Sequence, residues 1–320
     1  MAQTTAVSTP QNSNQRAYIA LIIGVTAVSL AAIFIRLAQG VDIPSIVIAS
    51  GRLIVAAVIL TPLVLRNSTY KQQIRQLESF ELLIIGISGF FLAIHFWSWV
   101  TSLEHTSVLI SVVLVTTTPI WVAILEIFFL KARLTQLIFL GLVVALMGSL
   151  VIGVGGEESA NTSGNNILGA GLSAIGAMTV AVYLIIGRRL RPKLALIPYI
   201  WMVYGFAAIV LSIVLILSGT SITGYDTEGY IWILAMGLIP QLIGHSSLNY
   251  ALAYLPATFI SVASQVEPVG SAIIAAVVFS EIPGIAQLIG SAIILAGVTL
   301  ASLGQAQLTN SKVKPETQSD

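Results

Sequence analysis

The chain is poor in the residues on which most enzymes and soluble domains depend. It has no cysteine among its 320 residues, and only 8% of its residues are charged. Without cysteine it has no disulfide, no thiolate metal ligand and no cysteine nucleophile. A soluble domain usually carries about 25% charged residues, whereas 57% of this chain is hydrophobic. The composition therefore predicts a protein whose solvent is lipid, and the net charge of +1 does not indicate a nucleic-acid partner.

Long apolar runs follow one another along the sequence, and a membrane-spanning helix needs about 20 mostly apolar residues. The first run is followed by no clear small-residue cleavage site, so we expect it to be a retained helix. These runs predict an all-α polytopic membrane protein. Ten transmembrane helices are expected, near 18–38, 45–65, 80–101, 107–130, 135–153, 168–187, 197–217, 230–254, 256–279 and 285–304.

Lysine and arginine are distributed unevenly over the connections between these helices. With the N-terminus inside, the inner segments contain 12 of the 14 basic residues, because only Arg36 and Arg52 fall within helices and the outer loops contain none. Positive charge concentrates on the cytoplasmic side of membrane proteins. We therefore expect both termini in the cytoplasm and the chain in the plasma (inner) membrane.

The sequence also repeats itself. Pro119 and Pro268 match at an offset of 149, and His95 and His245 match at an offset of 150. Five helices per half is an odd number, so the second half must enter the membrane upside down. Inverted repeats are typical of secondary transporters, whose substrate site lies between the repeats near the bilayer midplane. The expected units are a tail at 1–17, a five-helix repeat at 18–153, an outer loop at 154–167, a second repeat at 168–304 and a tail at 305–320.

Two charged residues interrupt apolar helices at similar depths. Glu267 lies eleven residues after Pro256, roughly 16 Å into the membrane at 1.5 Å per residue. An ionised acid there costs about 2.5–3.5 kcal/mol, so it must be paired, solvated or protonated. Pro268 is expected to break the helix, so that Gln265 and freed backbone can reach a ligand. Arg52 either grips a substrate carboxylate or phosphate or forms a permanent salt bridge with Glu267.

Polar stripes mark two more helices, because residues spaced i, i+3 and i+4 share one helical face. One stripe consists of Gln241, His245 and Asn249. The other consists of His95, Ser98, Trp99 and Ser102. Such stripes point to the interior of a membrane protein. They either line a substrate path or hydrogen-bond to neighbouring helices at about 0.6 kcal/mol per contact.

The remaining charges have simpler interpretations. Arg36 lies near the outer end of the first helix and can extend to the interface. Glu126 is expected to form a local salt bridge with Lys131. The outer rim is expected to contain solvated residues, namely Glu104, His105 and Glu281.

Three stretches carry a family resemblance: "SGRLIVAAVILTPLVLR", "TSVLISVVLVTTTPIWVAI" and "YLPATFISVASQVEPVGSAIIAAVVFSEIPGIAQLIGSAIILAGV". On these the chain resembles an EamA-type member of the drug/metabolite transporter superfamily, over about 18–304. The resemblance implies ten helices and secondary transport, often export, of small metabolites. One departure is Ala132, which stands where the second half has Glu281.

The function expected is secondary transport of a small polar metabolite, amino acid-like or a related solute, exported by alternating access. No zinc-protease, nucleophile-elbow or P-loop motif occurs, so we expect no enzyme activity, no metal and no cofactor. A non-transporting receptor or scaffold is the alternative, and a membrane-embedded enzyme ranks below it. The partners expected are the lipid bilayer and a small-molecule substrate; a coupling proton or ion and a homodimer are left open.

Overall fold

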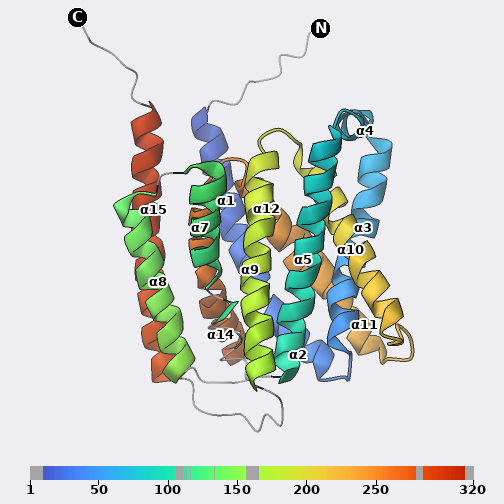
Figure 1. Cartoon of the computed structure of the whole chain (residues 1–320). Coiled ribbons are helices and arrows are strands. Elements are labelled where there is room, and N and C mark those ends of the chain that lie inside the picture. Colours follow the sequence, from blue (N-terminus) through green and yellow to red (C-terminus); the bar gives the residue numbers. More distant parts are fainter. Residues whose placement is uncertain are drawn as a thin grey trace, which may run out of the picture.

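The protein is described here by a computed structural model. It describes residues 10–105, 111, 114–115, 117–132, 134–155, 166–278 and 284–313. Within those ranges every regular element is a helix, and the helices stand side by side as one upright bundle (Figure 1). Both chain termini leave from one end of the bundle, which we call the termini end.

The helices and their bounds, in chain order, are α1 Pro10–Val28, α2 Ala31–Gln39, α3 Ser45–Arg66, α4 Ser68–Arg75, α5 Ser79–His105, α7 Thr118–Leu130, α8 Gln136–Gly155, α9 Asn166–Leu190, α10 Leu196–Leu217, α11 Thr227–Met236, the π-helical η1 Gly237–His245, α12 Ser246–Ala251, α13 Ala257–Ala263, the 3₁₀ turn η2 Ser264–Val266, α14 Glu267–Val278 and α15 Ile285–Val313.

Eight stretches of helix in the described chain are long and apolar enough to cross a membrane. They match eight of the ten predicted spans. The predicted helix 135–153 corresponds to an apolar helix at Gln136–Ile152, and the predicted helix 107–130 to Thr118–Leu130; both belong to a shorter class of 10–17 residues. Part of 107–117 lies outside the described residues. The chain is thus an all-helical integral membrane protein.

Helices from the two ends of the sequence pack against each other in pairs. α5 lies along α9, α1 lies along η1 and α12, α3 lies along α10, α7 lies along α13, and α8 lies along α15. Each pair joins a helix before residue 156 to one after residue 165. The core of the bundle is therefore built largely between the two halves of the sequence.

The α8–α15 pair has the closest backbones. A Cβ added at Gly148 would lie 2.7 Å from the Gly290 carbonyl oxygen, and one at Gly297 would lie 2.5 Å from the Ala145 nitrogen. Small residues let membrane helices approach this closely. The pair stands at one side of the bundle in Figure 1.

Several apolar helices are interrupted within their length. The predicted interruption at Pro268 is present as one 3₁₀ turn, because η2 lies between α13 and α14 and Pro268 is the second residue of α14. A turn at Thr117 likewise precedes α7, which has Pro119 in its first turn. A further break at Ser29 separates α1 from α2. Irregular backbone at membrane depth is tolerated where it is buried in protein or lines a cavity.

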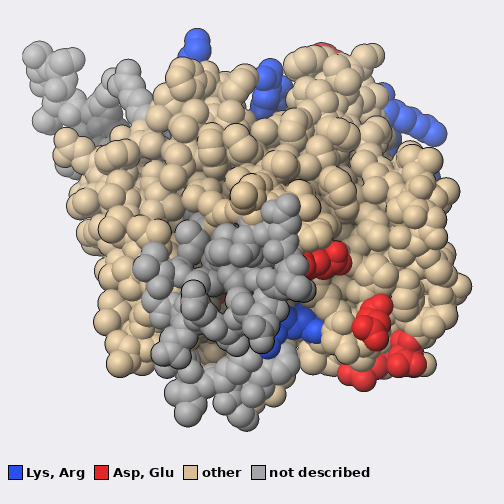
Figure 2. Space-filling model, turned by 60° about the horizontal axis from the view of Figure 1, so that its bottom comes forward, with Lys and Arg blue, Asp and Glu red and all other residues tan. Residues whose placement is uncertain are grey.

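Charges are unevenly distributed along the bundle axis. The face opposite the termini end carries acidic groups together with a basic one, whereas other basic groups stand at the far edge of that view (Figure 2). Four acidic residues of the described chain lie in the connections or helix ends at that face, namely Asp42, Glu104, Asp226 and Glu228. Lys71 and Arg75 belong to α4, which lies at the termini end (Figure 1).

Candidate functional site

Polar side chains gather inside the bundle and form what we call the central polar cluster. Its members come from five helical segments, α3, α5, α9, α10 and the η1–α12 helix. All but His245 are at most 8% exposed. The cluster consists of Arg52, His95, Tyr183, Tyr204, Gln241, His245 and Asn249.

Arg52 is the charged centre of this cluster and is fully buried. Its Nε donates a hydrogen bond to Oε1 of Gln241 at 3.0 Å. Its guanidinium carbon Cζ lies over the ring of Phe96, 3.9 Å from the ring centroid. Its two terminal nitrogens have no hydrogen-bond partner among the residues that the structure describes. The side chain is therefore held in place while four of its five N–H donors are unused.

Glu267 lies near Arg52 but does not pair with it. Glu267 is the carboxylate that interacts electrostatically with the guanidinium. The two groups are nevertheless more than 4.0 Å apart, because the ion pair within that distance among the described residues joins Lys193 and Glu81. A permanent direct salt bridge between Arg52 and Glu267 is thus not formed in this conformation. Glu267 begins α14 directly after η2, where Gln265 is buried at 2% exposure.

The break beside Glu267 adjoins a second one. The Ser271 hydroxyl donates to the Ser29 carbonyl oxygen at 2.7 Å. A Cβ added at Gly270 would lie 2.4 Å from the Ser29 hydroxyl oxygen. The interruption between α1 and α2 therefore contacts the first turn of α14, as expected for discontinuous helices around a binding site.

The predicted stripe of Gln241, His245 and Asn249 does face the interior. The Asn249 side-chain nitrogen donates to the Tyr183 hydroxyl and, at 2.7 Å, to the His245 carbonyl oxygen. The His245 ring packs edge-on against Phe96, with centroids 5.1 Å apart. The helix here is π-helical: the backbone N–H of Ser246 reaches the carbonyl oxygen five residues back. Such segments are frequent at functional sites.

The second predicted stripe divides between the cluster and a helix contact. The His95 Nδ1 donates to the Gly176 carbonyl oxygen at 2.9 Å, and the ring stacks with Trp99. Since Nδ1 is then the protonated nitrogen of a neutral ring, Nε2 is an acceptor. The hydroxyl of Ser98 bonds to its own helix at the His95 carbonyl oxygen, 3.2 Å away. Ser98 packs towards α9, because a Cβ added at Gly176 would lie 3.3 Å from its hydroxyl oxygen.

The expected salt bridge between Glu126 and Lys131 is wrong. Glu126 is 2% exposed, and its two oxygens accept from the backbone nitrogens of Ala257 and Thr258, each at 2.8 Å. The carboxylate therefore caps the N-terminus of α13, where free N–H groups and the helix dipole favour negative charge. Lys131 is exposed.

Two arginines that the sequence marks only as inner charges also bind helix ends. Arg188 donates to the Leu252 carbonyl oxygen at 2.7 Å, and Arg191 Nε donates to the Asn249 carbonyl oxygen at 2.9 Å. Both carbonyls lie at the C-terminal end of α12, where orphan acceptors and the dipole favour cations. The connection between α12 and α13 is thus held by charges on both sides.

The rim residues differ partly from expectation. Glu104 is exposed as predicted, but it also accepts from the Ser45 backbone nitrogen at 3.2 Å and caps α3. His105 is the last residue of α5, and Arg36 is exposed in the last turn of α2. Glu281 lies outside the described residues.

A groove of about 390 Å³ lies next to the cluster, between α1, α3, α10 and the η1–α12 helix. Ser246 lines it, and the Tyr204 hydroxyl of the cluster lies 3.4 Å from the Ser246 hydroxyl.

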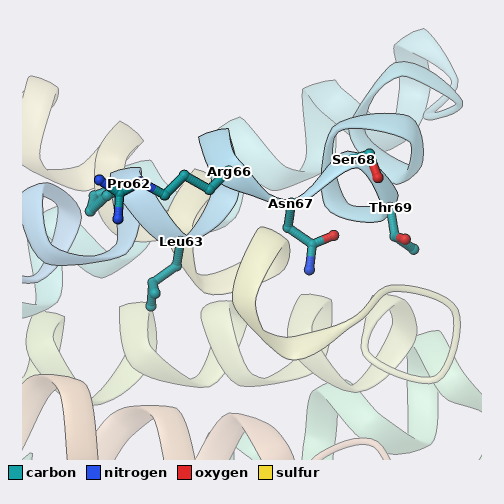
Figure 3. Close-up of a pocket in the computed structure, with 6 residues that line it drawn as sticks. All are labelled: Pro62, Leu63, Arg66, Asn67, Ser68 and Thr69. Atoms are coloured by element: carbon teal, nitrogen blue, oxygen red, sulfur yellow. The ribbon is translucent and has the colours of Figure 1, made fainter.

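A second pocket, of about 630 Å³, lies on the surface where α3 meets α4 (Figure 3). It is lined by Pro62, Leu63, Arg66, Asn67, Ser68 and Thr69. Arg66 is 14 residues beyond Arg52, roughly 21 Å along the helix at 1.5 Å per residue, so this pocket is separate from the cluster. No group of three metal-ligating side chains occurs in the part of the chain searched.

Sequence reasoning missed the aromatic part of the cluster. Tyr183 and Tyr204 place hydroxyls beside Asn249, and Phe96 supplies the surface for the guanidinium. The available signal was a tyrosine inside an otherwise apolar helix, since a buried hydroxyl needs a polar partner. Pro240 was the corresponding signal for the π-helix.

Comparison with known proteins agrees with this geometry. A relative, the "Uncharacterized transporter YdfC" of Bacillus subtilis (strain 168), is 25% identical over 177 residues, 55% of this chain. The match spans 56% of that relative, about half of its length. A solved crystal structure is similar with a TM-score of 0.73 and 18% identity over 93% of this chain and 99% of that chain, which shows the fold alone. The model of the EamA-like transporter family matches twice, at residues 15–154 and 167–303. The chain therefore belongs to the EamA-like transporter family.

Proposed function

We propose that the chain is a secondary transporter that exports a small polar metabolite, amino acid-like or a related solute, by alternating access. The observation that carries the proposal is a buried guanidinium with unused donors among interrupted helices. A charge and broken helices inside a membrane protein are expensive, and they mark substrate or ion pathways. The path runs past Arg52, Gln241, Asn249 and His95, with Glu267 beside them.

The architecture proposed is ten transmembrane helices in two inverted repeats, 18–153 and 168–304. The two family matches, the pairing of helices between the halves, and the turns directly before Pro119 and Pro268 support this arrangement. Basic residues at the termini end support cytoplasmic termini and a plasma (inner) membrane location. The active unit is a monomer or a homodimer.

An amino acid-like solute is proposed because the site holds a basic and an acidic side chain that do not pair directly with each other. A zwitterion would place its carboxylate at Arg52 and its ammonium group at Glu267. The sequence has no nucleotide-binding P-loop, so exchange, facilitated diffusion or coupling to a proton or other ion would set the direction of transport.

The test is uptake by proteoliposomes that contain the purified full-length chain, against a panel of amino acids, amines, organic acids and neutral solutes. The expected result is saturable uptake of at least one amino acid that Arg52→Gln abolishes and Arg36→Gln preserves. Uptake limited to solutes without opposite charges would refute the substrate class. A folded protein that moves no solute of the panel would refute transport and favour a receptor or scaffold.

A further inference from the structure

We infer that the terminal nitrogens of Arg52 form a subsite for an acid group, a carboxylate or a phosphate, on the transported solute. The inference rests on the proposed transport function and specifies the chemistry of one part of its substrate. It concerns atoms of the cluster for which the described protein supplies no hydrogen-bond partner.

The first step is that Arg52 cannot turn freely towards another partner. Gln241 holds its Nε at 3.0 Å, and Phe96 covers one face of the guanidinium. Gln241 and Phe96 are themselves at most 1% exposed, so the surrounding packing keeps both in place. The guanidinium therefore has a fixed plane, and its remaining edge carries the two terminal nitrogens.

The second step is that no acceptor of the described residues lies within hydrogen-bonding reach of the two terminal nitrogens. Oε1 of Gln241 accepts from Nε, and Glu267 lies beyond the 4.0 Å of an ion pair. Nδ1 of His95 donates to the Gly176 carbonyl oxygen and is therefore not an acceptor. Buried polar groups in proteins are almost always satisfied, so a partner from outside the chain is indicated.

The third step is the chemistry of that partner. The donors are charged, buried and arranged as a planar fork. Carboxylates and phosphates match such a fork with two parallel hydrogen bonds. A neutral carbonyl or hydroxyl would satisfy a donor but leave the positive charge uncompensated. The subsite is thus specific for an acid group, whatever the rest of the solute is.

The experiment uses the full-length chain in lipid nanodiscs and follows its thermal unfolding midpoint with matched probes. The pairs differ in one acid group: L-leucine against L-leucinamide, 4-methylpentanoate against 4-methylpentanamide, and glucose 6-phosphate against glucose. A ligand that binds the folded state raises the midpoint with concentration. We expect at least one acid to raise the unfolding midpoint at a concentration at least tenfold lower than its neutral or amide twin needs for the same shift.

Variants assign that response to the guanidinium. Arg52→Lys keeps the charge but lacks the fork, so the acid should bind at least tenfold more weakly, whereas Arg36→Gln should bind it as the wild type does. Three results would overturn the inference. The acid and its twin could raise the unfolding midpoint equally, or no acid could raise it. A folded Arg52→Lys protein could also respond to the acid as the wild type does. If Arg52→Lys does not fold, the wild-type comparison of twins still decides.

The failure of this inference is distinguishable from failure of the transport proposal. Proteoliposome uptake of a solute without an acid group, unaffected by Arg52→Lys, would overturn the acid subsite and leave transport standing. Acid-specific stabilisation without uptake of any bound acid would overturn transport and leave the subsite standing.

Discussion

Replacing Glu126 by alanine should destabilise the protein more than replacing any acid on its surface. The change removes two hydrogen bonds of 2.8 Å to a charged acceptor, and bonds of this kind contribute about 1.5–3 kcal/mol each. It also leaves the N–H groups of Ala257 and Thr258 without their acceptor, where the removed side chain was 2% exposed. We therefore expect a loss of about 3–6 kcal/mol in the free energy of unfolding.

The measurement is reversible denaturation in mixed micelles, followed by tryptophan fluorescence. Glu126→Gln keeps one acceptor oxygen and should lose about half as much, roughly 1.5–3 kcal/mol. The control is Glu81→Gln, which removes the 4.0 Å contact with a Lys193 side chain that is 74% exposed; such pairs contribute at most about 1 kcal/mol. If Glu126→Ala were no more destabilising than Glu81→Gln, the capping argument would be refuted.

Three further predictions follow from features of the fold. Gly148→Ala should lower the free energy of unfolding by about 1–3 kcal/mol, because the added Cβ would lie 2.7 Å from the Gly290 carbonyl oxygen. The control is Gly205→Ala, whose Cβ would have no atom within 4 Å and should cause no loss in the same denaturation assay. Glu267→Gln should fold and lose the pH dependence of uptake if this acid carries a coupling proton; a normal rate with an unchanged pH profile would exclude that role. Reporter fusions at the C-terminus and within 154–167 should lie on opposite sides of the membrane, and the same side for both would contradict the inverted repeat.

The sequence was informative wherever the constraint is local. Apolar runs of membrane length predict the spans, and Pro268 predicts the break in its own helix because a proline acts on the turn that contains it. The stripe of Gln241, His245 and Asn249 was recognisable from spacing alone. Its π-helical geometry was not, although Pro240 is a local signal for an interruption.

Contacts between distant segments were not predictable from spacing. Glu126 caps a helix 131 residues further on, while Lys131, only five residues away, offered a local partner that the fold does not use. Counting residues along the helices placed Arg52 and Glu267 at similar depths in the membrane. The count does not determine the direction in which either side chain points from its helix. The sequence therefore identified the chemistry of the cluster, and only the packing of α3, α5 and η1 specifies which atoms stay unpaired.

The glycines between α8 and α15 have a mechanical consequence. Gly141 and Gly148 face Gly290 and Gly297, so each helix repeats its contact every seven residues. The backbones interlock there, and a slide of one helix past the other would drive the Cβ of a neighbouring residue into a main chain. One helix belongs to each half of the sequence, yet the two are joined more extensively to each other than to any other helix. We therefore expect α8 and α15 to move as one unit in any rearrangement that exposes the cluster first to one side and then to the other.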